Sequence, residues 1–127
     1  MALLTETIGV ATPKQVDQVL DLMPEKDRLA VHFHDTRGTA IANCLQAIEH
    51  GITTVDSSAG GLGGCPYAKG ASGNVASEDV LYLLNGLGIE TGIDFEKMFD
   101  AGQFISRVLG RAPVSRASAA LAAKRAA

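Results

Sequence analysis

Short apolar runs alternate along the chain with longer amphipathic segments, which is the pattern of strands alternating with helices. The apolar-rich stretch Leu29–His34 predicts a buried strand. The β-branched stretch 52–56 predicts another, because branched side chains pack well on a pleated surface. Between the two, apolar residues recur at helical spacing over residues 39–50, and Gly51 follows directly. We therefore expect a helix that ends before this glycine.

The remaining segments extend the same alternation. Thr12-Pro13 opens a helix, since proline suits a first helical position, and Pro24 ends it. The other expected elements are a short strand over residues 2–4 and helices over 77–87 and 94–109. We expect one domain over residues 1–111, closed by a C-terminal helix. An Ala/Arg-rich tail over residues 112–127, frayed at its end, follows it.

Connections of this length between strands predict a parallel α/β sheet. Two architectures satisfy that prediction, a doubly wound open sheet and a (β/α)₈ barrel. A complete barrel takes roughly 250 residues, so a chain of 127 residues could supply only part of one. An open sheet of three strands would leave two unpaired edges. Periodicity alone does not choose between them.

Composition narrows the class of protein further. Apolar residues make up 46% of the chain and charged residues 20%, with a formal net charge of −3, so we expect no nucleic-acid partner. Since no run of about eighteen apolar residues occurs, we expect no membrane span. The two cysteines lack Cys-x-x-Cys spacing, which favours free thiols in a reducing compartment, and we expect a cytoplasmic location.

A His-Phe-His sequence ends the second predicted strand. Alternate side chains of a strand share a face, so His32 and His34 should point the same way, at the carboxyl end of a parallel strand. Two imidazoles so placed can bind one metal ion together. The motif is weak by itself, and the alternative is a pair of histidines that only hydrogen-bond to their neighbours.

A glycine-rich loop over residues 57–73 follows the third predicted strand and carries Cys65. It lacks the lysine and the glycine spacing of the common phosphate-binding loops. Cys65 lies outside any apolar stripe and is a candidate functional thiol, or else a small half-buried loop residue. Cys44 lies on the apolar face of a predicted helix and is expected to be a core residue. Asn74 is a candidate ligand or, alternatively, the N-cap of the next helix.

Several segments together resemble one enzyme family. Residues 55–68, with the string Gly-Leu-Gly-Gly-Cys-Pro-Tyr, resemble the active-site signature of 3-hydroxy-3-methylglutaryl-CoA (HMG-CoA) lyases. Residues 31–38 resemble their metal-binding strand, and the similarity continues through 70–74 and 87–92. The related isopropylmalate and homocitrate synthases share the His-x-His strand and a later asparagine. Their glycine loop has a different sequence, so the loop around Cys65 favours the lyases.

The resemblance implies that the chain is the C-terminal portion of a (β/α)₈ barrel enzyme that binds Mg²⁺ or Mn²⁺. It implies His32, His34 and Asn74 as metal ligands, Cys65 as the catalytic thiol, and an acid–base role for His32. The implied reaction cleaves HMG-CoA to acetyl-CoA and acetoacetate, a carbon–carbon lyase step of leucine degradation and ketone-body metabolism. The implied substrate is therefore an acyl-CoA.

The resemblance also implies parts that these 127 residues do not supply, an Arg-Asp pair and a glutamate from earlier strands. Glu6 stands where the family usually has an aspartate, which adds one methylene at a strand end. We therefore expect the chain alone to have little or no activity and to need a missing N-terminal barrel half, or to form a homo-oligomer. The alternatives are a Claisen-type acyltransferase of the synthase group and a non-catalytic barrel fragment that pairs with a partner half.

Overall fold

The computed structural model of the protein describes residues 1–64 and 73–127, and these form two compact units. The first unit holds residues 1–57 together with 63–75. The second holds residues 58–62 together with 76–127. The chain therefore passes from one unit to the other three times, after residues 57, 62 and 75.

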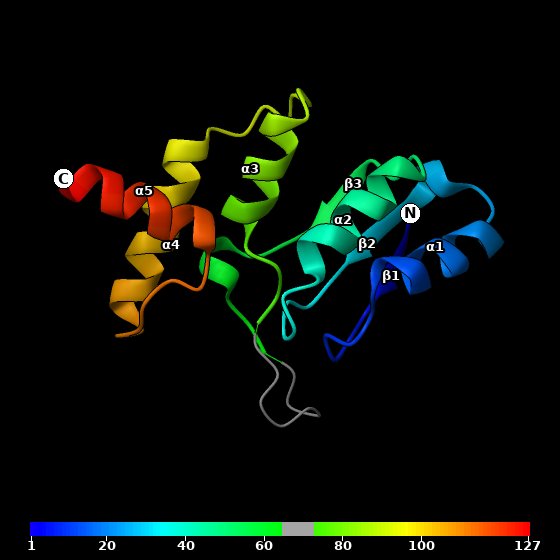
Figure 1. Cartoon of the computed structure of the whole chain (residues 1–127), viewed down its shortest axis with the longest axis horizontal. Helices are drawn as coiled ribbons and strands as arrows, with labels where there is room; N and C mark the ends of the chain where they lie inside the picture. Colours follow the sequence, from blue (N-terminus) through cyan, green and yellow to red (C-terminus); the bar gives the residue numbers. More distant parts are fainter. Residues whose placement is uncertain (65–72) are drawn as a thin grey trace. The chain divides into compact units, whose positions relative to one another are not determined.

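A parallel three-stranded sheet forms the centre of the first unit (Figure 1). Its strands are β1 (Ala2–Thr5), β2 (Leu29–His32) and β3 (Thr54–Asp56), in the order β1-β2-β3. All neighbouring strands run parallel, and helices connect them. The predicted alternation of helices with parallel strands is therefore confirmed in the first unit.

The register aligns the carboxyl ends of the three strands. Thr5 lies opposite His32 in the β1–β2 pair, and His32 lies opposite Asp56 in the β2–β3 pair. The backbone N–H of Glu6 donates to the carbonyl of His32 at 2.9 Å, which extends the pairing by one residue. Active sites of parallel α/β proteins form at this end of the sheet, where the loops leave the strands.

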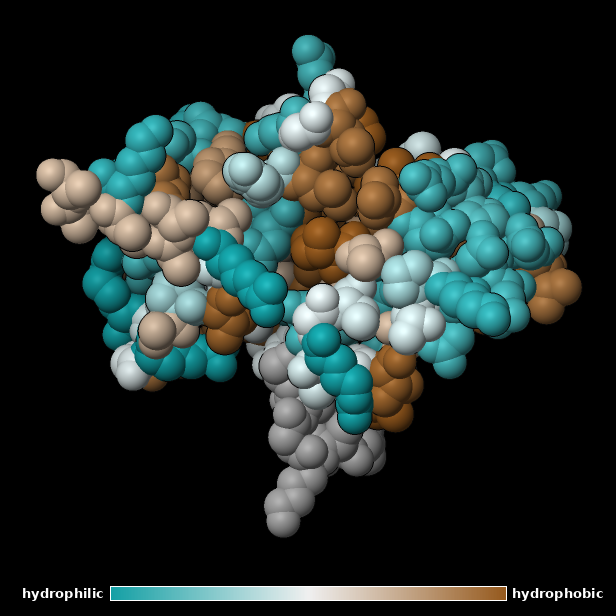
Figure 2. Space-filling view, viewed as in Figure 1, coloured by the Kyte–Doolittle hydropathy of each residue, from teal (hydrophilic) through white to brown (hydrophobic). Residues whose placement is uncertain are grey.

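Two helices, α1 (Pro13–Leu22) and α2 (Ala40–Glu49), accompany the sheet in the first unit, and η1 (Lys26–Arg28) is a short 3₁₀ turn. The outward side of α1 is mostly hydrophilic in Figure 2. Its buried side presents Val16 and Leu20, at the i, i+4 spacing that places two residues on one helical face. The rest of this core comprises Leu29, Ala30, Val31, Phe33, Ala40, Cys44, Ala47, Ile52 and Val75.

Two of the predicted strands are shorter than expected, each for a backbone reason. The strand predicted over 29–34 ends at His32. Beyond it, the Phe33 carbonyl accepts a hydrogen bond from the amide of Val75 rather than from a neighbouring strand. The strand predicted over 52–56 begins at Thr54. The amide of Ile52 still donates to the Ala47 carbonyl at the end of α2, at 3.1 Å.

Three helices dominate the second unit: α3 (Ser77–Gly86), α4 (Phe95–Val108) and α5 (Arg116–Ala126), together with η2 (Ala59–Gly61). Helix α3 packs against both α4 and α5. Helix α5 occupies most of the expected tail, so residues 116–126 are helical. The expected division of the chain at residue 111 stays a prediction. Within the described ranges, none of the helices has the length and apolar character needed to cross a membrane.

The N-terminus of α5 depends on the first turn of α3. The Asp79 carboxylate accepts hydrogen bonds from the Ser115 hydroxyl at 2.7 Å and from the Ala117 amide at 2.8 Å. Ser115 in turn accepts from the amide of Ser118. These contacts satisfy amides that have no partner within α5. An Ala-rich segment of eleven residues is a marginal helix in isolation, so this cap explains why it is ordered here.

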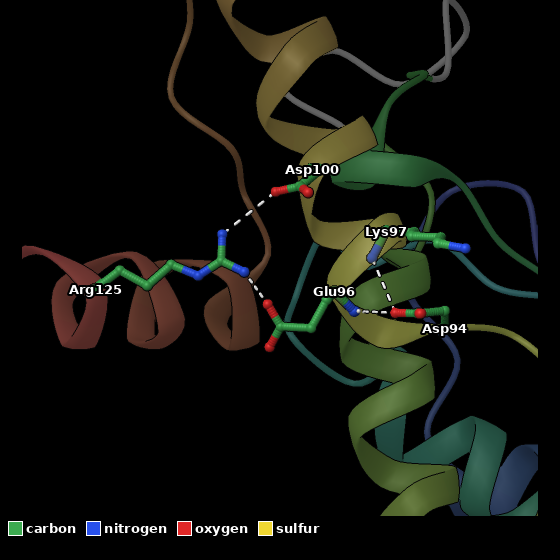
Figure 3. Close-up of polar contacts among 5 residues, drawn as sticks. All are labelled: Asp94, Glu96, Lys97, Asp100 and Arg125. Atoms are coloured by element: carbon green, nitrogen blue, oxygen red, sulfur yellow. Dashed lines mark hydrogen bonds and ion pairs between the residues drawn. The ribbon is translucent and has the colours of Figure 1, made fainter.

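The other end of α5 is fastened to α4 by Arg125 (Figure 3). Its guanidinium pairs with the carboxylates of Glu96 and Asp100, the latter at 3.3 Å, and its Cζ lies 4.5 Å from the centre of the Phe99 ring. The start of α4 is capped by Asp94, whose carboxylate accepts from two backbone amides of the first turn. Three interactions therefore converge on one side chain.

We predict that Arg125→Ala lowers the free energy of unfolding by about 1 kcal/mol, since the ion pairs are solvent-exposed and a cation–π contact contributes a similar small amount. The measurement is urea denaturation followed by circular dichroism. The neighbouring Lys124 is exposed, so Lys124→Ala serves as the control and should change stability by less than about 0.5 kcal/mol. The difference should shrink in high salt. Equal effects of the two substitutions would contradict the role of Arg125.

Candidate functional site

The two histidines predicted to act together do lie together at the carboxyl end of β2. The centres of the His32 and His34 rings are 5.1 Å apart, with their planes inclined at 66°. His32 is the last residue of β2, and His34 lies just beyond it in an isolated bridge. Between them Phe33 is buried in the core. The alternation expected of extended backbone therefore holds past the end of the regular strand.

His32 is oriented by a carboxylate of the adjacent strand. Its Nδ1 lies 2.7 Å from Oδ2 of Asp56, the residue opposite it at the end of β3. A neutral imidazole that donates from Nδ1 keeps its lone pair on Nε2. A carboxylate on one imidazole nitrogen is the usual arrangement behind a histidine that binds a metal through the other nitrogen.

Asn74 joins the same end of the sheet although it lies forty residues after His34 in the sequence. The two residues form an isolated antiparallel bridge. The amide of Asp35 donates to the Gly73 carbonyl at 3.3 Å, and the amide of Val75 donates to the Phe33 carbonyl at 3.0 Å. Helix α3 begins at Ser77 with Ala76 as its N-cap, so Asn74 does not cap it. The alternative interpretation of Asn74 as a helix cap is therefore wrong.

A glycine lets the Asn74 side chain approach the glycine-rich segment. Gly63 has a φ of +103°, and a Cβ at this position would lie 2.9 Å from Nδ2 of Asn74. Both the backbone conformation and the short approach exclude larger residues without a local shift. The absence of a side chain at Gly63 therefore leaves room for the Asn74 side-chain amide.

The three predicted ligands offer a donor set that fits a divalent cation. His34 is buried, and its Nδ1 has no hydrogen-bond partner among the described residues. A buried imidazole nitrogen without a partner is unusual, because leaving such a group unpaired carries a desolvation penalty. Together with the oriented His32 ring and the Asn74 carboxamide, it provides nitrogen and oxygen donors from one end of the sheet.

The loops that follow β1 and β2 are tied to each other next to this site. The carboxylate of Glu6 accepts hydrogen bonds from the amides of Ile8, Gly9 and Val10, at 2.9 to 3.2 Å. Arg37, from the loop after β2, donates to the Gly9 carbonyl at 2.9 Å. Through these hydrogen bonds the Glu6 side chain, one methylene longer than aspartate, orders the loop that follows β1.

Only one of the two cysteines, Cys44, lies in the part of the chain that the structure describes. Cys44 is fully buried, and burial, with a smaller contribution from the Asp35 charge, raises the pKa of its thiol to about 12. It is a core residue, as predicted, and too weakly acidic to act as a nucleophile or an acid–base group at neutral pH. Cys65, the candidate catalytic thiol, lies outside the described residues.

A second group of potential ligands, Asp17, Asp21 and His50, connects α1 to the end of α2. His50 Nε2 lies 2.8 Å from Asp17, while the Lys26 ammonium lies 3.3 Å from Nδ1. Because an ammonium group only donates, Nδ1 accepts from it and the Nε2 proton is directed at Asp17. Both nitrogens are occupied and a positive charge is adjacent, so this group is a structural contact between helices.

Asp56 is the site residue whose role the sequence reasoning did not identify. The signal that could have located it is the parallel register: an acidic residue at the end of one strand faces a histidine at the end of its neighbour. The length of each strand must be known before that pairing can be read, and the predicted strand over 29–34 was too long by two residues.

A parallel sheet with a carboxylate-oriented imidazole, a second buried imidazole and a carboxamide at its carboxyl end defines an α/β protein with a candidate metal site. The comparison with known families agrees with that class. The model of the HMGL-like family matches residues 2–105. The chain belongs to the HMGL-like family.

Named relatives are similar over nearly the whole chain. A hydroxymethylglutaryl-CoA lyase of Arabidopsis thaliana mitochondria is 57% identical over 93% of this chain and 26% of its own length. A 3-hydroxy-3-isohexenylglutaryl-CoA/hydroxymethylglutaryl-CoA lyase of Pseudomonas aeruginosa is 57% identical over 95% of this chain and 41% of its own length. A cytoplasmic 3-hydroxy-3-methylglutaryl-CoA lyase of Mus musculus also matches, at 49% identity over 92% of this chain and 35% of its own length.

The solved structures agree. A crystal structure of hydroxymethylglutaryl-CoA lyase from Pseudomonas aeruginosa superposes with a TM-score of 0.91 and 54% identity, over 96% of this chain and 42% of that one. The chain therefore spans less than half the length of the relatives that it matches. These shares do not confirm that it is the C-terminal portion of a longer protein.

We predict that Gly63→Ala lowers the free energy of unfolding by about 1–3 kcal/mol, because it adds backbone strain and a contact with Asn74. Gly51→Ala is the matched control, since Gly51 has a φ of +87° and nothing within 4 Å of its Cβ position. It should show the backbone strain alone, about 1 kcal/mol. The added substitution Asn74→Ala should recover the difference between the two variants. Equal destabilisation by Gly63→Ala and Gly51→Ala in thermal or urea denaturation would contradict the close approach.

Proposed function

We propose that the chain carries the metal-ligand and thiol part of a hydroxymethylglutaryl-CoA lyase active site. The observation that supports this most directly is the convergence of His32, His34 and Asn74 at the carboxyl end of β2. Relatives at 57% identity are named as lyases of this type. In this proposal the three strands belong to a (β/α)₈ barrel that further strands complete, and the unpaired edges of β1 and β3 are where they would join.

The proposed cofactor is a divalent cation, Mg²⁺ or Mn²⁺, held by His32, His34 and Asn74. A bound cation would lower the pKa of a substrate hydroxyl and stabilise the charge that develops on its oxygen. The three ligands are neutral, so a hard cation should bind them weakly without an added carboxylate. An aspartate from another part of a complete barrel would supply that charge.

The proposed substrate is a 3-hydroxy-3-methylglutaryl thioester of coenzyme A. A base takes the proton of the tertiary hydroxyl, and the oxygen becomes a ketone as the adjacent carbon–carbon bond breaks. The electron pair of that bond remains on the acetyl-CoA fragment as an enolate, which then takes a proton. The products are acetoacetate and acetyl-CoA.

His32 is the proposed base and Cys65 the proposed acid. Because Nδ1 of His32 is engaged by Asp56, only Nε2 remains for other partners. Cation binding and proton acceptance therefore compete for one nitrogen. Asp56 favours both roles, since a carboxylate on Nδ1 fixes the orientation of the ring and leaves the lone pair on Nε2. Cys65 would return a proton to the enolate carbon.

The location and assembly of the protein are also proposals. Relatives with mitochondrial and cytoplasmic names both match the chain, so the expected cytoplasmic location stays a prediction. A partner that completes the barrel, either another polypeptide or a second copy of this chain, would supply the missing carboxylate and arginine. An acyl-CoA is the expected small-molecule partner.

The metal proposal predicts that the chain binds Mn²⁺ and that Asp56→Asn weakens this binding about 10- to 100-fold, because the His32 ring loses its orienting carboxylate. His34→Ala should remove measurable binding. The measurement is titration of the full chain with Mn²⁺, followed by electron paramagnetic resonance of the free ion. Asp27 is exposed and serves for the control Asp27→Asn, which should bind as the unaltered chain does. If His34→Ala also binds normally, the ligand assignment is wrong.

The reaction proposal predicts little or no acetoacetate from the purified chain with HMG-CoA and Mn²⁺. It predicts robust turnover when the chain replaces the matching segment of the Pseudomonas aeruginosa lyase. In that chimera Cys65→Ala should lower kcat by about 10²- to 10⁴-fold and leave Mn²⁺ affinity unchanged. Cys44→Ala is the matched control and should retain turnover.

Three results would count against this proposal. An inactive but folded and Mn²⁺-binding chimera would argue against lyase competence of the segment. Unchanged turnover of Cys65→Ala would remove the thiol from the reaction. Condensation of acetyl-CoA with an oxo acid by the same chimera would favour the synthase group instead.

A further inference from the structure

His50 contacts three charged groups from two neighbouring elements of the first unit. It is the C-cap of α2, and only 12% of its side chain is exposed. Its Nε2 lies 2.8 Å from Oδ1 of Asp17 in α1. Its Nδ1 lies 3.3 Å from the Lys26 ammonium in η1 and 3.9 Å from Oδ1 of Asp21 in α1. One nitrogen of this ring therefore faces both a cation and a carboxylate.

No further charged group of the surrounding elements takes part. The remaining charged residues of α1, α2 and residues 25–28 are Lys14, Glu25, Asp27, Arg28 and Glu49. Within the described part of the chain, none of them makes a hydrogen bond or an ion pair with His50. Asp17 is also held by Gln46, whose side-chain amide donates to it at 3.1 Å. The charge on the ring therefore decides its contacts with Lys26 and Asp21.

The turn η1 depends on contacts from outside itself. Glu25 precedes it with a φ of +49°, in the left-handed region that residues other than glycine rarely adopt. The amide of Arg28 donates to the Glu25 carbonyl at 2.9 Å. The amide of Leu29, the first residue of β2, donates to the Lys26 carbonyl. Since one 3₁₀ turn is weakly held by its own hydrogen bonds, the ammonium of Lys26 on His50 helps to fasten the start of β2 to the end of α2.

Protonation of His50 reverses the preference at Nδ1. An imidazolium donates from both nitrogens, so Nδ1 can no longer accept from Lys26, and two positive charges would face each other. Asp21 is directed at the same nitrogen, and its side chain is 67% exposed, so its carboxylate can approach the ring. The position at the C-terminal end of α2 also favours a positive charge. The protonated ring therefore binds the two carboxylates of α1 and repels the ammonium.

We propose that His50 is a pH-sensitive switch: the neutral ring holds Lys26, and with it η1, whereas the protonated ring releases Lys26 and holds Asp21. Histidine side chains change charge between about pH 5 and pH 8, so the exchange of contacts is to be measured across that range. Asp17 stays on Nε2 in both states, so α1 remains attached to α2. Only the connection between α1 and β2 responds. The switch is independent of the proposed lyase chemistry, since none of these residues is a proposed ligand or acid–base group.

The first test is nuclear magnetic resonance of the isotopically labelled full chain at about pH 8 and about pH 5. The chain has three histidines, and the variant His50→Gln identifies the signals of this ring. At the higher pH the ring should carry its proton on Nε2 and show a nuclear Overhauser effect to the Lys26 side chain. At the lower pH both nitrogens should be protonated. The effect to Lys26 should then be lost, and one to the Asp21 side chain should appear.

The second test is amide hydrogen exchange of the same chain, expressed as protection relative to the intrinsic rate at each pH. The amides of Arg28 and Leu29 report on η1, because they donate to carbonyls of this turn and the residue before it. Their protection should fall on the order of tenfold from about pH 8 to about pH 5. The amide of Met23, bonded to Leu20 at the end of α1, should keep its protection, which separates a local opening from unfolding.

Two variants assign the change to this contact. His50→Gln should retain the protection of η1 at both pH values, because a neutral amide can accept from Lys26 and donate to Asp17 whatever the pH. This variant also separates His50 from the other two histidines, which it leaves in place. Lys26→Met should give the low protection at both pH values. Lys14 is an exposed lysine of α1, so Lys14→Met is the matched control and should respond to pH as the unaltered chain does.

The switch is wrong if the neutral ring carries its proton on Nδ1, or if the contact with Lys26 persists when both nitrogens are protonated. It is equally wrong if the ring stays neutral down to about pH 5. A fall in the protection of η1 that persists in His50→Gln would assign the response to another group. Equal loss of protection in Lys26→Met and Lys14→Met at about pH 8 would also overturn it, because the ammonium of Lys26 would then have no specific effect on η1.

Discussion

The candidate site depends on one backbone junction, at which the segment that returns from the glycine-rich loop pairs with the residues just after β2. Phe33, Asp35 and His34 take part from the strand side, and residues 73–75 from the other. A strand end normally has unpaired amides and carbonyls, which require partners when they are buried. Here those partners also bring Asn74 to the histidines. The same hydrogen bonds therefore end the strand and assemble the donor set.

Two carboxylates, one in each unit, perform different physical tasks. Asp56 is largely exposed, and its charge orients an imidazole while remaining hydrated. Glu78 is fully buried, which raises its pKa, and hydrogen bonds from backbone amides and from the Ser118 side chain oppose the rise. A buried charge without a counter-ion is stable only where hydrogen bonds hold it, so the backbone that donates those bonds is held as well. At Gly60 such a contact supplies order that the residue cannot supply itself, since glycine has no side chain to pack.

Sequence reasoning identified the elements and most of the candidate site, and its errors have specific causes. It placed both histidines on one face because the period of extended backbone is two, and that local rule held. It placed Cys44 in the core from helical spacing, as the structure confirms. It interpreted Asn74 as a possible cap because α3 begins nearby, but helix ends are located only to within a few residues by pattern. Sequence reasoning expected the tail to fray at its end. It could not include the cap on α5, because that cap comes from Asp79, far away in the sequence.

The sequence by itself determined what short-range physics controls: the alternation of strands and helices, the shared face of His32 and His34, and the apolar spacing that buries Cys44. Only the tertiary structure decided the contacts that join distant segments. These are the pairing of Asp56 with His32, of Asn74 with His34, and of Glu78 with Gly60. Such contacts depend on strand register and on which helix packs where. Those are properties of the folded chain as a whole, and no local window of residues contains them.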